Sequence, residues 1–408
     1  MMRKTLISIL CLVACAFHSM TYATDFASKV NTLIGTDYTG NTYPGAQVPF
    51  GMVQLSPDNG LPGWDRIAGY FYPDSTIAGF SHTHLLGTGA GDLYDISFLP
   101  VTLPYNEAEE PLGIHSRFTH KDETAHAGYY QVRLTDYDIN VELTATPRCG
   151  VQRYTFPNDG KERMVILDLN KAMNWDATVD SKINVVDSFT IEGYRYSDGW
   201  ARNQRVWFRT RFSQPIKSLE IENKKLQNNP NGVGCIARFK FATEGFDKLV
   251  VTTALSPTSL EGAQKNLQAE AKTDDFDAVR RQAETLWNNE LGRIEIEGAS
   301  KSQETVFYTS LYHAMSATYV ALRRRRHLSW CRPQVAQSRW LEQLRDMLVV
   351  GYLPRCTSSL RHPHASKSRR DGQFAHCVQQ GERTPADMEH VVVGDRYDDW
   401  LPCSLCHC

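Results

Sequence analysis

The chain has 408 residues, of which 41% are hydrophobic and 22% charged, and its formal net charge at pH 7 is −2. This length allows two domains with sizeable cores, and the composition is that of an ordinary soluble protein. With a net charge near zero, nothing in the composition calls for nucleic acid, which is not expected as a partner.

Residues 1–23 have the features of an export signal. Arg3 and Lys4 precede an apolar run from Leu6 to Phe17, and Thr21-Tyr22-Ala23 provides a small-x-small cleavage site. Because twelve apolar residues are too few to cross a bilayer, this run predicts no transmembrane segment. The mature chain is therefore expected outside the cytoplasm, in the periplasm, at the cell surface or secreted.

A lipid anchor is the alternative at this terminus. The order Leu12-Val13-Ala14-Cys15 resembles a bacterial lipobox, which would place a lipid on Cys15. We favour ordinary cleavage after Ala23, because the residues after Cys15 continue apolar and do not form a polar tether.

The stretch from Val30 to Pro100 combines glycine, aromatic and polar residues with little regular apolar pattern. Eleven glycines occur from Gly35 to Gly91. So many positions that tolerate positive φ or close backbone approach predict a surface of turns that holds side chains, not a packed layer. Aromatic faces beside Asp, Asn and His suit a polyhydroxylated ligand. The stretch therefore predicts a ligand site, or half of one.

Trp64 and Asp65 are the first candidate residues for this site. A sugar ring has an apolar C–H face that stacks on an aromatic ring, and hydroxyl groups that require donors and acceptors. The pair offers both kinds of contact in two residues. An equal alternative places Trp64 in the core and Asp65 as the cap of a turn. Gly87 and Gly89 are further candidates, since glycine lets a backbone approach a ligand.

His82 and His84 are the second pair of candidates. On an extended segment, two imidazoles spaced by two project from one face, where they could bind zinc or contact a substrate. No third ligand follows at a diagnostic spacing. Hydrogen-bonded structural or substrate-contacting histidines are therefore favoured over a zinc hydrolase.

From Ala127 to Leu255 short segments alternate between apolar and polar residues, which predicts half-buried strands. The strands expected beyond residue 160 cover residues 163–169, 190–196, 206–212, 235–241 and 248–255. Many strands without intervening helices predict an antiparallel β-sandwich. A loop is expected over residues 223–232.

Cys149 and Cys235 are the only cysteines between residues 24 and 320. An extracellular compartment would permit a disulfide between them, but spacing does not determine pairing. We favour two reduced, buried thiols.

Helix signals begin after the predicted strands. Ser259 is expected to cap a helix that runs to about Lys272, and a second, amphipathic helix is expected from Phe276 to Gly292. Residues 293–297 alternate like a short strand. Residues 305–320 predict a further helix.

Three blocks of the first hundred residues occur in one order: residues 30–36 (VNTLIGT), residues 40–57 (GNTYPGAQVPFGMVQLSP) and residues 79–89 (GFSHTHLLGTG). They resemble the amino-terminal domain of glycoside hydrolase family 92. The resemblance extends from about Thr24 to about Tyr319, with Leu33 where the family usually has Phe. It implies a β-sandwich followed by an (α/α)6 barrel, with the site between the two.

The domains implied are a signal peptide (1–23), a β-sandwich (24–257), linker helices with the first barrel helix (258–320) and a tail (321–408). The resemblance also implies a calcium-dependent exo-acting α-mannosidase, commonly α-1,2. Its substrates would be α-mannoside oligosaccharides or the mannose of N-glycans. The main alternative function is a non-catalytic carbohydrate-binding β-sandwich.

No residue of this chain is predicted as a catalytic acid, a catalytic base or a calcium ligand. An inverting glycosidase needs two carboxyl groups on opposite sides of the scissile bond. In the family these groups and the calcium ligands lie in the barrel. Asp92 and Asp95 are three residues apart, but we interpret them as turn-capping or supporting carboxylates.

From Ala321 the composition changes abruptly. The last 88 residues contain thirteen arginines and one lysine, six cysteines and six histidines, but no isoleucine or asparagine. A basic tail for an anionic partner, a zinc-binding tail and disorder are three interpretations. The run from Arg323 to Arg326 suits the first. The Cys-x-x-Cys spacing near Cys408 supports zinc only weakly, because no second pair lies at the partner distance.

A reading frame shifted by one base explains more of this tail. The codons for residues 350–360 can be chosen so that the shifted frame encodes Trp-Asp-Thr-Phe-Arg-Ala-Ala-His-Pro-Leu-Tyr, which resembles a block of the family's barrel. The same shift gives Asp-Val-Asp-Gly-Ile-Tyr-Arg-Gly-Ala-Asp around the four arginines and Asp-Thr-Met-Thr-Gly-Tyr-His over residues 396–403. Three matches in one order and one frame predict a frameshift product that does not fold, and hence a truncated, inactive chain.

Overall fold

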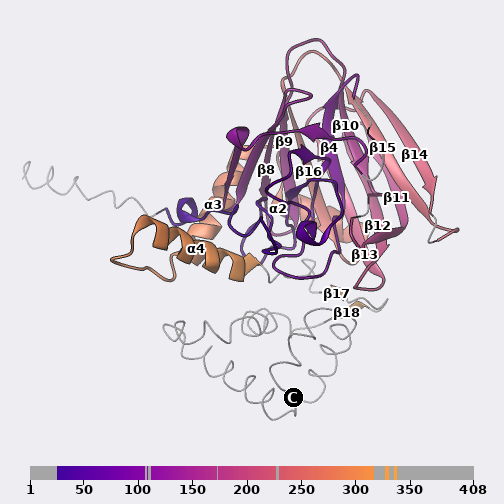
Figure 1. The fold of residues 1–408 in the computed structure, drawn as a ribbon. Helices are drawn as coiled ribbons and strands as arrows, with labels where there is room; N and C mark the ends of the chain where they lie inside the picture. The colour runs from indigo at the N-terminus through magenta and orange to yellow at the C-terminus, as the bar shows by residue number, and fades with distance from the viewer. Residues whose placement is uncertain are drawn as a thin grey trace, which may run out of the picture.

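The computed structural model describes residues 25–105, 108, 112–171, 173–226 and 229–316, and the backbone of residues 327–329 and 335–337. Two large antiparallel sheets enclose a common core, and three α-helices follow them in the chain (Figure 1). The predicted fold class, a mostly β antiparallel sandwich followed by helices, is confirmed. The proposed signal peptide and most of the tail lie outside the described residues.

The smaller sheet has six strands. Their order is β1 (Ser56–Asp58), β3 (Gly79–Ser81), β4 (Ser97–Thr102), β10 (Arg163–Asp168), β15 (Val233–Phe241) and β14 (Ser218–Lys225). The first three strands come from the glycine-rich stretch, and the last is an edge strand.

The larger sheet has eight strands. Their order is β11 (Ala177–Asp187), β12 (Thr190–Asp198), β13 (Gln204–Phe212), β16 (Lys248–Ser256), β9 (Cys149–Thr155), β8 (Ile139–Ala145), β7 (Tyr129–Leu134) and β6 (Glu123–His126). A separate short pair joins β2 (Thr76–Ile77) to β5 (Ser116–Arg117), and three short 3-10 helices cover Ala27–Lys29 (η1), Trp64–Arg66 (η2) and His120–Asp122 (η3).

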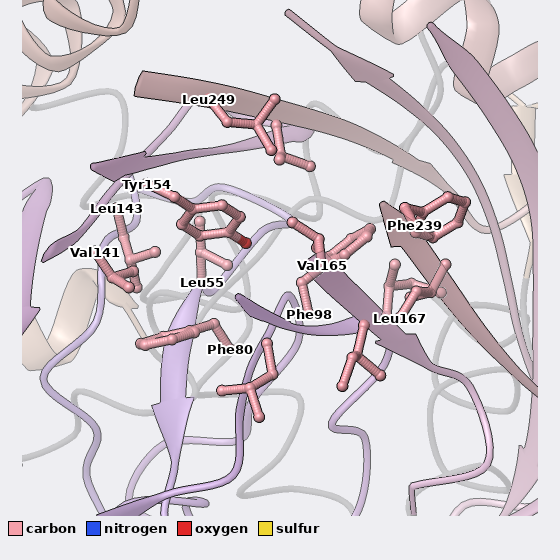
Figure 2. Close-up of a cluster of buried hydrophobic side chains, with 14 of the residues drawn as sticks. Leu55, Phe80, Phe98, Val141, Leu143, Tyr154, Val165, Leu167, Phe239 and Leu249 are labelled. Carbon is pink, nitrogen blue, oxygen red and sulfur yellow. The ribbon is translucent and has the colours of Figure 1, made fainter. Parts of the chain in front are cut away.

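Alternating side chains of the two sheets meet in one continuous apolar core, which Figure 2 shows in close-up. Val141 and Leu249 come from the larger sheet, and Val165, Leu167 and Phe239 from the smaller one. All five are fully buried, which at about 25 cal/mol per Å² of apolar surface makes this core the main stabilising contribution to the sandwich.

The glycine-rich stretch is packed more tightly than its sequence indicates. Tyr43, Phe80 and Tyr94 are all buried, and Phe80 and Phe98 form a cross-strand pair within the core. The prediction that this stretch is a surface of turns, not a packed layer, is therefore wrong for most of its length. The glycines of the stretch fit turns between buried segments, so part of the stretch lies in the core and part at the surface.

The two cysteines are reduced and buried, as predicted. Cys149 lies on β9 of the larger sheet and Cys235 on β15 of the smaller sheet. Burial raises the pKa of both thiols, which keeps them protonated and unreactive.

The helices are α2 (Leu260–Glu270), α3 (Phe276–Leu291) and α4 (Lys301–Ser316). Ser259 caps α2 as predicted, because its hydroxyl accepts a hydrogen bond from the Gly262 backbone N–H at 3.0 Å. Helix α2 packs on β13 and β16, and α3 packs on β8. Residues 293–297 form no strand, so that prediction is wrong, and α4 begins four residues earlier than expected.

A second apolar cluster joins α3 and α4 to the amino-terminal segment. Trp287 of α3 is fully buried, its ring lies 4.5 Å from that of Tyr312 on α4, and its indole N–H donates to the Gln47 carbonyl at 2.7 Å. The Gln47 side chain accepts from the Tyr43 hydroxyl and donates to the Tyr312 hydroxyl. The helices are thus fastened to the glycine-rich stretch itself.

Two short strands lie beyond α4. β17 (His327–Ser329) and β18 (Val335–Gln337) pair with each other in antiparallel fashion. The other residues of the tail that the sequence predicts to be unfolded lie outside the described part of the chain. Among the described residues, no helix combines the length and apolar character needed to cross a bilayer.

Replacing Trp287 with Ala is expected to destabilise the chain by about 3–5 kcal/mol, because it opens a cavity and leaves the Gln47 carbonyl without its donor. Urea unfolding of the full chain measures this loss. Val306→Ala is the matched control on α4, where the side chain is 56% exposed, and its expected effect is within about 0.5 kcal/mol. Equal midpoints for the two variants would contradict the role of Trp287.

Candidate functional site

Trp64 lies at the surface, at the start of η2, with 56% of its side chain exposed. The alternative that placed this tryptophan in the core is therefore wrong. Asp65 follows it in the same turn and is half-buried. The indole is thus accessible to a ligand, and the role of the pair in sugar binding stays a prediction.

Two further tryptophans continue from Trp64. The ring centroid of Trp175 lies 5.9 Å from that of Trp64, and the ring of Trp200 lies 5.7 Å from that of Trp175. Both contacts are edge-to-face, with interplanar angles of 71° and 77°. We call Trp64, Trp175 and Trp200 the tryptophan ladder. Sequence reasoning missed two of its members, although Trp175 is followed by Asp176 as Trp64 is by Asp65.

The loops that carry the first two indoles are bonded to each other. The Asn174 side chain accepts from the Gly63 backbone N–H at 2.9 Å and donates to the Arg66 carbonyl at 3.3 Å. The backbone N–H groups of Trp175 and Asp176 both donate to the Gly91 carbonyl, at 3.3 and 3.2 Å. These contacts fix Trp175 against the end of the glycine-rich stretch.

Gly91 has no space for a larger residue. A Cβ atom at this position would lie 2.6 Å from Asn174 Cβ and 2.9 Å from the Trp175 ring. Gly87 is constrained differently, because its φ of +65° favours glycine while its surroundings are open. Gly87 is exposed and Gly89 half-buried, so both candidate glycines lie at the surface, in the segment that leads to Gly91.

Asp92 and Asp95 hold the loops together. The Asp92 carboxylate accepts from the backbone N–H groups of Trp200 and Ala201, at 2.9 and 2.8 Å. Asp95 accepts from Thr83 at 2.8 Å and forms an ion pair with Arg195 at 2.7 Å. Their interpretation as turn-capping and supporting carboxylates is confirmed.

Arg195 lies beneath this surface and is 1% exposed. All five of its N–H donors are used, because the guanidinium group donates to Thr178 Oγ1, the Leu93 and Lys171 carbonyls, and the Asp95 and Asp176 carboxylates. Burial raises the pKa of Asp176 to about 7, while the nearby Arg195 charge lowers it and Asp95 raises it further. The guanidinium group therefore joins the end of the glycine-rich stretch, at Leu93 and Asp95, to the segment that carries Trp175.

His82 and His84 are buried, with exposures of 0% and 2%. The His84 ring bonds to the Gln54 carbonyl at 2.8 Å and to Asp58 Oδ1 at 2.9 Å, while His82 Nδ1 bonds to the Ile96 carbonyl at 2.7 Å. Neither imidazole reaches solvent, so their geometry is that of a supporting framework.

The described residues contain no group of three or more His, Cys, Asp or Glu side chains placed to hold a metal ion. The paired histidines thus do not fit a zinc centre. The same part of the chain offers no cluster of carboxylates that fits the six to eight or so oxygen ligands of calcium.

Comparison with known proteins defines the class. The family model described as the glycosyl hydrolase family 92 N-terminal domain matches residues 29–256, and the model of the family 92 catalytic domain matches residues 262–327. The chain belongs to glycosyl hydrolase family 92.

Solved structures of the family are similar in fold. The GH92 α-mannosidase BT3965 of Bacteroides thetaiotaomicron, in complex with mannoimidazole, is 32% identical with a TM-score of 0.72, covering 77% of this chain and 43% of that one. The inverting GH92 mannosidase BT2199 of Bacteroides thetaiotaomicron VPI-5482 is 28% identical with a TM-score of 0.61, covering 71% and 39%.

A curated relative is an uncharacterized secreted glycosidase of Arthroderma benhamiae, 24% identical over 72% of this chain and 42% of its own length. This chain therefore spans less than half the length of each of these relatives.

Lowering the pH is expected to destabilise the chain through His82. Burial lowers the pKa of His82 to about 4, although its hydrogen bond to the Ile96 carbonyl raises the pKa in part. Between pH 6.5 and pH 4 the unfolded state therefore binds a proton that the folded state does not, and stability falls as the pH is lowered. Between pH 7 and pH 5 this residue should remove about 2 kcal/mol of stability.

Chemical unfolding across this range tests the expectation. His82→Gln cannot be protonated and should show a loss smaller by about 2 kcal/mol than wild type. A wild type and a variant with parallel stability curves would show that His82 does not titrate in this way.

Proposed function

We propose that this chain is the amino-terminal part of an exported α-mannosidase that releases mannose from α-linked mannosides. Membership in family 92 is the observation that carries the proposal, because the similar solved structures are α-mannosidases and one of them holds mannoimidazole. The substrates would be mannoside oligosaccharides or the mannose of N-glycans, with an α-1,2 linkage. The secreted relative and the apolar run after Arg3 and Lys4 support export.

The surface near Trp64 suits the non-reducing end of such a substrate. The exposed indole offers its face to the C–H side of a mannose ring, and Asp65 provides an acceptor for hydroxyl groups beside it. Gly87 and Gly89 allow the backbone to approach the sugar. His82 and His84 would act from beneath, by holding these loops in place.

The chemical step needs groups that these residues do not supply. Asp92 and Asp95 are committed to structural bonds, so they do not form the acid and base pair of a glycosidase. We place that pair, and the ligands of a calcium ion that would hold mannose hydroxyl groups, in the part of the family's catalytic domain that follows the segment matched by residues 262–327 of this chain.

For this chain we propose that a frameshift replaces that part. The match to the catalytic domain ends at residue 327, close to Ala321, where the composition changes. The 408-residue chain would then carry the sandwich and the first barrel helix but lack the catalytic groups.

The 408-residue chain is therefore expected to release no mannose from α-1,2-mannobiose, even with calcium added, because the acid and base are missing. The frame-restored protein is the matched control and should be active. Limited proteolysis of the 408-residue chain should begin near Val320. Mannose release by the purified chain, or a protease-resistant core that extends through Trp400, would refute the frameshift proposal.

In the frame-restored protein, Trp64→Ala should lower kcat/KM on mannosides by an amount on the order of 1–3 kcal/mol, because a stacking face is lost. Trp207→Ala is the control, since this half-buried indole on β13 contacts Tyr196 and lies outside the ladder. Unchanged kinetics for Trp64→Ala would exclude Trp64 from the substrate site. Mannoside binding without turnover in the restored protein would instead favour a non-catalytic binding protein.

A further inference from the structure

Strand β14 leaves one edge of the sandwich open. It is the last strand of the smaller sheet, and among the described residues it pairs with β15 alone. None of its eight residues is buried, although Leu219 and Ile221 lie opposite the fully buried Phe239 and Ala237 of β15. Figure 1 shows β14 at the outer edge of the molecule, on the side away from α3 and α4. The backbone N–H and C=O groups on the free side of such a strand can bind a further strand.

Apolar side chains are exposed beside this edge. Ile221 is 37% exposed, and Val185, near the end of the edge strand β11, is 53% exposed. The turn after β11 is bonded to the segment that leads into β14, because the Ser188 carbonyl accepts from the Ile216 backbone N–H at 2.8 Å. The edge strands of the two sheets therefore leave apolar side chains in water on the same side of the sandwich, and such exposure marks an interaction surface.

Strand β14 lacks the backbone features that usually prevent edge pairing. Residues 218–225 contain no proline or glycine, and their register with β15 runs without a bulge. Charged side chains also protect an edge, most strongly where like charges would face each other. In β14 the charges are segregated, with Glu220 and Glu222 first and Lys224 and Lys225 last. A second copy of the strand that runs antiparallel to the first therefore presents the opposite sign at each end.

The charges select one register of this pairing. Side chains keep their faces only if even-numbered residues lie opposite even-numbered ones. With Asn223 on a two-fold axis, Glu222 of each copy lies opposite Lys224 of the other, so two ion pairs form. A shift by one step in either direction places Glu222 or Lys224 on the axis, opposite the same residue of the second copy.

We infer that β14 joins two copies of this chain by antiparallel pairing about Asn223, so that their two six-stranded sheets become one continuous sheet. Glu222 is available for this contact, because its side chain is 41% exposed although it also pairs with Arg238 at 3.1 Å. Ile221 lies opposite Lys225 of the second copy, whose aliphatic stem covers it. A second copy is favoured over an unrelated partner because the strand carries its own complement of charge.

The pairing leaves the tryptophan ladder accessible. Asn229 follows β14, and its side chain donates to the Val179 carbonyl at 2.7 Å, near the start of β11 and hence near Trp175. The ladder thus lies beyond the carboxyl end of β14. Because the two paired strands run in opposite directions, the ladders of the two copies lie at opposite ends of the dimer.

Sedimentation equilibrium of the full 408-residue chain tests the inference, because it gives the Kd of the dimer. Wild type should form a dimer and no larger species, since a two-fold contact is closed. Glu222→Lys and Lys224→Glu should each raise the Kd about tenfold or more, because two like-charged pairs replace two ion pairs. The double variant exchanges the two charges and should return the Kd to within about threefold of wild type.

A mixture of the two single variants gives the sharpest result. In a mixed dimer one strand carries only lysines at the two positions and the other only glutamates, so both pairs are attractive again. The mixture should therefore associate about as tightly as wild type, while each variant alone does not. Lys121→Glu is the matched control, because this exposed lysine lies on η3, next to the opposite edge of the larger sheet, and it should leave the Kd unchanged. Far-UV circular dichroism confirms that each variant is folded.

Three results would overturn the inference. The first is a wild type that stays monomeric up to its solubility limit. The second is a dimer whose Kd neither single variant changes, because its contact would then lie elsewhere in the chain. The third is a mixture of the two variants that stays monomeric, since the charges would then not face each other. None of these results depends on mannoside binding, so the proposed function is tested separately.

Discussion

The buried guanidinium group of Arg195 is the interaction on which the site surface depends. It takes an arginine out of water, and this is tolerable only because all five donors meet acceptors and two carboxylates offset the charge. Those acceptors belong to β4's preceding loop, to β11 and to the segment before it. Removing Arg195 itself would leave two buried carboxylates without their cation, so the loops and the strand depend on it as one unit.

This arrangement explains how irregular segments can present rigid side chains. Trp64, Trp175 and Trp200 stand on three different segments, yet Asn174 bonds the Trp175 loop to the turn of Trp64, and Gly91 and Asp92 bond the segments of Trp175 and Trp200 to the end of the glycine-rich stretch. The sandwich holds the ends of these loops rigidly, and the loops carry the three tryptophans at the surface. The division of labour is common in proteins that place binding residues on a β scaffold.

The regular part of the molecule was predictable because local pattern determines it. Alternation over residues 190–196 and 248–255 corresponds to β12 and β16, and the Ser259 cap needs only a side chain and a nearby N–H group. The prediction for the glycine-rich stretch was wrong because polar side chains such as Asp58 and His84 bond to each other inside the core. Periodicity carries no information about such pairing.

The site was predictable only in part, for a related reason. Trp64 and Asp65 are adjacent in the sequence, so their joint chemistry can be seen directly. Trp175 meets Trp200 because β11 and β12 bring their ends together, and Asn174 bonds the Trp175 loop to the turn of Trp64. Arg195 acts through partners up to 102 residues away. Contacts of that range follow from topology, which one sequence does not specify at the level of individual side chains.

The bond between Gln47 and the helices has a consequence for the order of folding. Gln47 meets Trp287 and Tyr312, which lie 240 and 265 residues later in the chain. A chain that emerges from its amino terminus cannot close this contact until α4 has been made, and closures of such long loops are slow. The segment around Gln47 therefore reaches its final packing only after the strands of the sandwich have been made. The boundary between the two family domains is thus a boundary in sequence, whereas buried contacts cross it.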